Sequence, residues 1–153
     1  MKILMVCLGN ICRSPLAEGI LRHKIEQAGL DWHVESAGTG SWHVGEAPDP
    51  RSQKIAALNG IDISRQKAQK FIPEHFSKFD VIYTMDSSNY RDVVNQATNE
   101  SDKNKVELIM NVVIPGKNQA VPDPYYDDEL YEVVYEMLDM ACEGVVRSEG
   151  MKE

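Results

Sequence analysis

Residues 2–15 have the sequence KILMVCLGNICRSP, and this segment sets the fold of the chain. Its first half, Lys2 to Leu8, is short, continuous and apolar and stops at a glycine, a pattern typical of a buried strand. Ser14 and Pro15 suit the N-cap and the first position of a helix. The segment therefore predicts a strand that turns directly into the N-terminus of a helix.

Further strand and helix patterns alternate along the chain. The expected strands cover residues 33–37, 80–85 and 106–113. The expected helices cover residues 15–28 with a stop at Gly29, 50–60 with Asp49 as cap, a short helix within 71–79 opened by Pro73, a polar helix from 87 or 88, and 128–147. Because helices connect successive strands, the sheet should be parallel and covered on both faces.

The composition excludes several classes of protein. The 153 residues fit one domain, and 42% apolar with 26% charged residues is ordinary for a globular protein. Sixteen Lys and Arg against twenty-four Asp and Glu leave a net charge of −8, which argues against a nucleic-acid partner. The longest apolar run, residues 3–8, is far shorter than the roughly 20 residues that span a membrane. Three cysteines argue against a disulfide framework, so we expect a reducing, cytoplasmic setting.

Residues 7–14 combine the features of an anion-binding loop. Backbone N–H groups in such a turn point inward at a helix N-terminus, whose dipole also favours an anion. Arg13 offers a planar fork for two phosphate oxygens, and Cys7 would meet the same anion as a thiolate able to attack phosphorus. A lone cysteine at a strand end is more often a small core residue. Here strand, glycine, arginine, serine and proline occur in the required order, so we name residues 7–14 the phosphate loop.

No metal or cofactor is expected. Cys7 and Cys12 lack a second pair of ligands. The four histidines, at positions 23, 33, 43 and 75, show no ligand spacing.

The stretch from Cys7 to Pro15 resembles the signature loop of the low-molecular-weight protein tyrosine phosphatases, and the similarity extends over nearly the whole chain. The other matching landmarks, in order, are Ser36-Ala37-Gly38-Thr39, Ala47-Pro48-Asp49-Pro50-Arg51, Met85-Asp86 with Ser88-Asn89, and Asp123-Pro124-Tyr125-Tyr126. The resemblance implies hydrolysis of phosphotyrosine, or of other aryl phosphomonoesters, through a phosphocysteine intermediate. Cys7 would be the nucleophile and Arg13 the phosphate clamp. The phosphate-binding loop would comprise Leu8, Gly9, Asn10, Ile11, Cys12, Arg13 and Ser14.

For the fold we expect an α/β architecture, a single three-layer domain over residues 1–153. Its four-stranded parallel sheet would be Rossmann/flavodoxin-like, with strand order 2-1-3-4. Ligands of such sheets bind beyond the carboxyl ends of the strands, where the strand order reverses. The first strand should end there, at Cys7 and Leu8.

The proposed chemistry also needs an acid, because a phenolate or alkoxide leaves only if its oxygen is protonated. Asp123 is the candidate, since it follows the fourth strand and therefore lies at the same edge of the sheet as Cys7. Pro124 favours an extended backbone at Asp123. Most Asp-Pro pairs are only solvated turns, and the choice of Asp123 depends chiefly on the family pattern. The same carboxylate would then activate water as a base.

The family pattern assigns further roles around the loop. Ile11, Trp42 and Tyr125 would form apolar pocket walls for a flat aryl ring, although Trp42 could equally be ordinary surface packing. Asn10, Ser14 and Ser36 would support the loop, with Ser14 either donating to the sulfur of Cys7 or only capping the helix.

Two features qualify this pattern. Cys12 either fills space or, as in the family, forms a reversible disulfide with Cys7. Many relatives have a histidine soon after the Gly-Ile segment near residue 61, where this chain has Ser64-Arg65-Gln66-Lys67, so its loop support must be completed differently.

Three other functions compete with this interpretation. An arsenate reductase on the same fold would need further cysteines to relay a disulfide, but the third cysteine is Cys142, in the final helix. A protein arginine phosphatase is disfavoured by Ile11, whose rigid apolar group suits a flat ring better than a guanidinium. A non-catalytic phosphate-binding module would not need Asp123. We therefore expect a phosphotyrosine protein or a small aryl phosphate as partner, no membrane contact, and a monomer with at most weak self-association.

Overall fold

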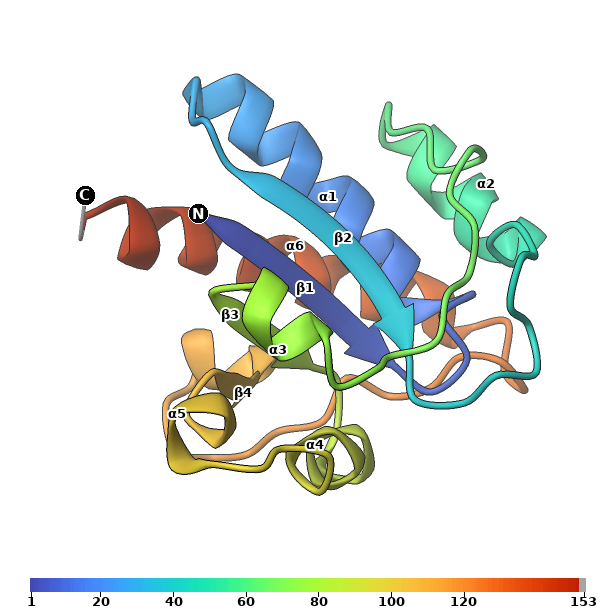
Figure 1. Ribbon diagram of the computed structural model, residues 1–153. Coiled ribbons are helices and arrows are strands. Elements are labelled where there is room, and N and C mark those ends of the chain that lie inside the picture. Colours follow the sequence, from blue (N-terminus) through green and yellow to red (C-terminus); the bar gives the residue numbers. More distant parts are fainter. Residues whose placement is uncertain (152–153) are drawn as a thin grey trace.

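The chain alternates strands and helices (Figure 1). The computed structural model describes residues 1–151. In chain order the elements are β1 (Lys2–Cys7), α1 (Arg13–Ala28), β2 (His33–Gly38), α2 (Pro50–Leu58), α3 (His75–Lys78), β3 (Val81–Thr84), α4 (Ser87–Val94), α5 (Glu100–Lys103), β4 (Val106–Leu108), the 3-10 helix η1 (Ile109–Val112) and α6 (Leu130–Gly150).

The four strands form one parallel sheet in the order β2-β1-β3-β4, as predicted. β1 lies in the middle, with Met5 paired to Ser36 of β2 on one side and to Tyr83 of β3 on the other. In a parallel sheet all carboxyl ends meet at one edge. β1 therefore delivers Cys7 to the edge where the strand order reverses.

Helices cover both faces of the sheet, which confirms the predicted α/β layering. Successive side chains of a strand point to opposite faces. Ile3 and Met5 join a core with residues of α1 and α6, whereas Leu4 and Val6 join a second core with residues of α3 and α4. All four side chains are fully buried. A central strand buried on both faces explains why its sequence is a continuous apolar run rather than an alternating one.

The predicted fourth strand, residues 106–113, is wrong beyond Leu108. β4 is three residues long, and the chain continues as the 3-10 helix η1. Ile109 and Met110 are both buried in the core on the α6 side, which a strand could not achieve because adjacent side chains would point apart. Gly144 of α6 allows this close packing, since a Cβ there would lie 2.7 Å from Val112 Cγ1.

Several helix boundaries also differ from the sequence predictions. α1 begins at Arg13 with Cys12 at the N-cap position and no side-chain cap, so Ser14 is not the N-cap. Within 71–79 only His75–Lys78 is helical, and the short helix α5 was not predicted. The expected caps are confirmed at Asp49, whose side chain accepts from the N–H of Arg51, and at Gly29, which has φ of 67°.

Gly38, the last residue of β2, lets β2 pass directly behind the phosphate loop. A Cβ at this position would lie 2.8 Å from the carbonyl oxygen of Leu8 and 3.0 Å from the nitrogen of Asn10. Both atoms are backbone, so neither can rotate away. The phosphate loop can hold its position only with glycine at residue 38.

We expect Gly38→Ala to lower the free energy of unfolding by roughly 1–3 kcal/mol, because the loop backbone must shift. The variant should also bind inorganic phosphate more weakly. Urea unfolding and calorimetric phosphate titration measure the two effects. Gly150→Ala is the control, because nothing lies within 4 Å of the added methyl group, and equal behaviour of the two variants would contradict the steric argument.

Candidate functional site

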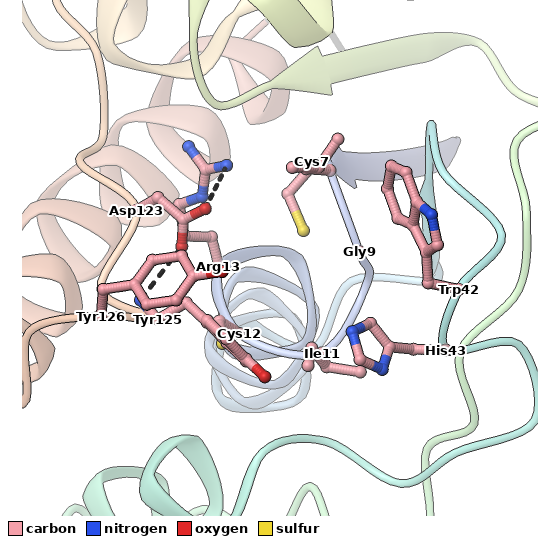
Figure 2. Close-up of a pocket in the computed structure, with 11 residues that line it drawn as sticks. Cys7, Gly9, Ile11, Cys12, Arg13, Trp42, His43, Asp123, Tyr125 and Tyr126 are labelled. Carbon is pink, nitrogen blue, oxygen red and sulfur yellow. Dashed lines mark hydrogen bonds and ion pairs between the residues drawn. The ribbon is translucent and has the colours of Figure 1, made fainter.

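A cavity of about 330 Å³ opens at the carboxyl edge of the sheet. Its lining residues are Cys7, Leu8, Gly9, Ile11, Cys12, Arg13, Trp42, His43, Asp123, Tyr125 and Tyr126. In Figure 2 the sulfur of Cys7 lies in the middle, with Trp42 and His43 on one side and Asp123 and Tyr125 on the other. The structure thus gathers residues from three separate segments around one sulfur atom.

The phosphate loop turns sharply between β1 and α1. Asn10 has φ of 57°, in the left-handed region that asparagine adopts more readily than most residues. Its N–H donates to the sulfur of Cys7 over 3.3 Å. The loop therefore curls around the sulfur, which faces a backbone donor close to the N-terminus of α1, as an anion nest requires.

The side chain of Asn10, which is buried, holds the loop from inside. Its Nδ2 donates to the hydroxyl oxygens of Ser14 at 2.8 Å and of Ser36 at 2.9 Å. Its Oδ1 accepts the N–H of Gln69 at 2.9 Å. Ser36 in turn donates to Glu18 at 2.7 Å. The structure brings the three predicted support residues together, and it adds Glu18 and the main chain of Gln69, which the sequence analysis missed.

The segment that lacks the family's histidine does not complete this network with its side chains. Gln66 donates from Nε2 to the carbonyl oxygen of Pro15 at 3.1 Å, on the first turn of α1. Its buried Oε1 has no hydrogen-bond partner among the described residues. The loop support is closed instead by the main chain of Gln69 on one side and by the Ser36–Glu18 hydrogen bond on the other.

Ser14 connects this support to the sulfur. Its Oγ lies 3.0 Å from the Sγ of Cys7 and already accepts from Asn10, so its own proton is free for another acceptor. The carbonyl oxygen of Ala37 is a poorer acceptor at 3.5 Å. The geometry therefore favours a Ser14 hydroxyl that donates to sulfur, and the capping alternative does not occur.

Arg13 is buried and oriented by acceptors on other elements. Its Nη1 donates to Asp86 Oδ2 at 2.7 Å and to the carbonyl oxygen of Val121 at 2.9 Å. Burial opposes its charge, but Cys7, Asp86 and Asp123 together hold the pKa of Arg13 above its ordinary value. Asp86 lies between β3 and α4, and the sequence pattern marks it as a family landmark without a site role. The signal that could have identified it as a site residue is its position just after β3, at the carboxyl edge of the sheet.

Asp123 lies at the mouth of the cavity with its side chain 42% exposed. Its Oδ2 is 3.7 Å from Nη2 of Arg13, and its Oδ1 accepts the N–H of Tyr125 at 3.1 Å. Figure 2 shows the ion pair with Arg13 on the side of the cavity opposite Trp42. A carboxyl group in this place faces both the cavity and solvent.

The three predicted wall residues all line the cavity, but they differ in exposure. Ile11 is buried, whereas Trp42 is 70% exposed and its ring covers Gly40, where a Cβ would lie 1.9 Å from it. His43 is a wall residue that the sequence analysis missed. Its Nδ1 bonds Glu46 at 2.8 Å, and its ring lies 6.5 Å from that of Tyr125.

Cys12 is buried where the phosphate loop packs against α6. Its Sγ lies 3.3 Å from the hydroxyl of Tyr131 in α6. Burial raises the pKa of Cys12 to about 11, with a smaller opposing effect from the Tyr131 hydrogen bond. Cys12 therefore remains a neutral thiol near neutral pH, and all three cysteines of the chain are free.

Comparison with known proteins identifies the family. The family model described as low molecular weight phosphotyrosine protein phosphatase matches residues 2–153. The chain belongs to this family. A Schizosaccharomyces pombe low molecular weight phosphotyrosine protein phosphatase is 44% identical over 128 residues, covering 82% of this chain and 81% of that protein.

Solved structures agree with this assignment. A protein tyrosine phosphatase from Entamoeba histolytica with Hepes in the active site superposes with a TM-score of 0.92 at 33% identity, covering 99% of this chain and 98% of that one. A Drosophila arginine phosphatase superposes with a TM-score of 0.89 at 32% identity, covering 96% of each chain. The predicted family is thus confirmed, and the chain is a phosphatase, a hydrolase of the low molecular weight class.

Neither a metal site nor a membrane-spanning helix is found within residues 1–151. No group of three or more His, Cys, Asp or Glu side chains is arranged to hold a metal ion. In this same part of the chain, the helices are too short or too polar to cross a membrane.

The two loop cysteines should differ sharply in alkylation. Iodoacetamide near neutral pH should modify Cys7, which faces the cavity, and leave Cys12 intact, because the pKa of Cys12 is raised to about 11. Cys12 labelling should then rise about tenfold per pH unit up to that pKa. Tandem mass spectrometry of the peptide that contains both cysteines separates the two sites. In Cys7→Ser, labelling of this peptide at neutral pH should vanish, and substantial Cys12 labelling there would refute the assignment.

Proposed function

We propose that this phosphatase hydrolyses phosphotyrosine, or small aryl phosphates, through a phosphocysteine intermediate, and that residues 1–153 act as one phosphatase domain. The observation that carries the proposal is the convergence of the Cys7 sulfur, the Arg13 guanidinium and the Asp123 carboxyl group on one cavity of about 330 Å³. A nucleophile, an anion clamp and an acid are the groups that phosphoryl transfer from an aryl ester requires.

Substrate binding depends on the phosphate loop and Arg13. Both N–H groups of Arg13 Nη1 are occupied by Asp86 and Val121, so the Nε and Nη2 edge is left to grip two phosphate oxygens. Backbone N–H groups of the loop and the N-terminus of α1 complete the anion site. The phosphorus would then lie above the sulfur of Cys7.

In the first chemical step the thiolate of Cys7 attacks phosphorus. The S–P bond forms as the P–O bond to the aryl group breaks, and Asp123 gives its proton to the leaving oxygen. Arg13 and the loop N–H groups stabilise the charge on the transferring phosphoryl oxygens. The 3.7 Å between Asp123 and Arg13 keeps the acid beside the phosphate.

In the second step water attacks the phosphocysteine. Asp123, now a carboxylate, takes a proton from the water, and the S–P bond breaks to release inorganic phosphate. The sulfur leaves as a thiolate, which the Ser14 hydroxyl at 3.0 Å and the Asn10 N–H at 3.3 Å stabilise as hydrogen-bond donors.

The walls favour an aromatic substrate. Ile11, Trp42 and Tyr125 surround the opening with apolar surface, onto which a tyrosine ring can stack. A relay of disulfides, as in arsenate reduction, is disfavoured because Cys142 is fully buried in α6, with its sulfur directed to the carbonyl oxygen of Ala17.

Cys7→Ser should reduce the hydrolysis of p-nitrophenyl phosphate to the uncatalysed background. Asp123→Asn should lower kcat by roughly 100-fold or more with this substrate, because the attack of water on the phosphocysteine loses its base. Both proteins should still bind phosphate, since the loop and Arg13 are intact. EDTA should not change the wild-type rate, because the anion site consists of backbone N–H groups and Arg13. Activity in Cys7→Ser, or a wild-type rate in Asp123→Asn, would remove that residue from its role.

Arginine phosphatase activity is the second candidate, because the Drosophila structure has that activity in its name. We expect kcat/KM for a phosphotyrosine peptide to exceed that for the same peptide with phosphoarginine, since the apolar group of Ile11 suits a flat ring better than a charged guanidinium. Parallel phosphate-release assays measure both rates. The reverse preference would make arginine dephosphorylation the primary activity.

A further inference from the structure

Arg51, in the first turn of α2, connects three separate parts of the structure. Its Nε and Nη2 donate to the two carboxylate oxygens of Asp49 at 2.9 and 2.8 Å, and its Nη1 donates to Asp128 Oδ1 at 2.6 Å. Its guanidinium also lies over two rings, 4.9 Å from the centroid of Tyr131 and 5.5 Å from that of Tyr125. Only a planar fork can make the paired hydrogen bonds and the ring contacts together, so lysine would not be equivalent.

The N-terminus of α2 is joined to the back of the phosphate loop. The N–H of Asp49 donates to the carbonyl oxygen of Ile11 at 2.8 Å, and the hydroxyl of Ser52 donates to that of Cys12 at 3.3 Å. Asp49 also caps α2 by accepting the N–H of Arg51 at 2.8 Å. The first turn of α2 is thus a platform with a fixed position relative to the nucleophile loop.

Residues 123–128, which we name the acid segment, need such a platform because they are largely exposed. Tyr126 is 94% exposed, and the side chain of Asp128 is 81% exposed. Within the segment the N–H of Tyr125 donates to Asp123, so the position of Tyr125 determines where that carboxyl group lies. Arg51 contacts the segment at two points, the ring of Tyr125 and the carboxylate of Asp128.

We propose that Arg51 is a positioning residue for the general acid: it holds the acid segment against the α2 platform and thereby fixes Asp123 over the cavity. The proposal depends on the role of Asp123 proposed above. Within residues 1–151, the side chain of Arg51 donates hydrogen bonds to Asp49 and Asp128 and none to the phosphate loop. The carbonyl oxygens of Ile11 and Cys12 in that loop accept from Asp49 and Ser52 instead. Loss of the Arg51 side chain should therefore impair proton transfer by Asp123 and leave anion binding by the phosphate loop unchanged.

The expected signature is a changed dependence on the leaving group. As the S–P bond forms and the P–O bond breaks, p-nitrophenolate can leave without a proton, whereas the more basic phenolate requires the proton of Asp123. We expect Arg51→Met to lower kcat/KM about tenfold for phenyl phosphate and less than about threefold for p-nitrophenyl phosphate. Competitive inhibition by inorganic phosphate should be unchanged, and Arg51→Lys should recover only part of the loss.

A double-mutant cycle tests whether Arg51 acts through Asp123. In the Asp123→Asn background, Arg51→Met should cause no further loss with phenyl phosphate, because the group that it positions is already gone. The proposal would be overturned if the two substitutions lowered kcat/KM multiplicatively in the double variant. It would also be overturned if Arg51→Met alone lowered kcat/KM equally for both leaving groups.

The same measurements separate this proposal from the proposed mechanism. An unchanged leaving-group dependence in Asp123→Asn would overturn both the acid role of Asp123 and the positioning role of Arg51. A steeper leaving-group dependence in Asp123→Asn that is absent from Arg51→Met would overturn only the positioning role of Arg51.

Lys54→Met is the matched control, since it removes an exposed cation from the same helix. Lys54 lines the same groove as Arg51 and Asp128, but among residues 1–151 it has no hydrogen bond or ion pair to the acid segment. The control variant should retain wild-type kcat/KM for both substrates. If Arg51→Met does not fold, Asp128→Asn carries the test, because it weakens only the contact between Arg51 and the end of the acid segment. We expect the same change in leaving-group dependence there, about threefold in size, and a wild-type dependence would overturn the proposal.

Discussion

The buried amide of Asn10 is the interaction on which the rest of the site depends. Through Ser14 it reaches α1 and the sulfur, through Ser36 it reaches β2, and through the N–H of Gln69 it reaches the segment that follows α2. A buried amide is costly unless its donors and its acceptor find partners, so the three contacts stabilise one loop conformation against others. The left-handed backbone of Asn10 places its own N–H on the sulfur as part of the same turn.

This rigidity explains how an acidic protein can bind a dianion. The net charge of −8 acts at long range and is screened by salt, whereas the phosphate site consists of short-range donors. Among residues 1–151, Arg13 is the only Lys or Arg side chain that lines the cavity, and Asp86 orients it through a hydrogen bond. Residues 71–153 carry seventeen acidic and seven basic side chains, while residues 1–70, which contain the loop, carry seven and nine. The excess negative charge thus lies mostly in the other half of the chain.

Sequence patterns predicted the fold well where local rules govern. The apolar run of β1, the proline and aspartate at the start of α2 and the glycine after α1 each act within a few residues, and each was found as expected. The predictions that failed are those in which tertiary contacts override the local pattern. Ser14 has the right side chain for a cap, but Asn10 and Cys7 bind its hydroxyl instead. The apolar run from Val106 onward has no period, so its change from strand to 3-10 helix at Ile109, set by packing near α6, could not be recognised.

The residues of the candidate site also fall into two groups, those that act on sequence neighbours and those that act on distant residues. The phosphate loop is contiguous, and its glycine, cysteine, arginine and serine act on neighbours, so its chemistry could be predicted from order and spacing alone. Glu18, His43, Asp86 and Arg51 act on groups that lie far away in the chain: Arg51 binds Asp128, 77 residues on, and Arg13 binds Asp86, 73 residues on. No local pattern encodes such a pair. It forms because the strand order β2-β1-β3-β4 brings the loops that follow different strands to one edge of the sheet, where burial and charge select their partners.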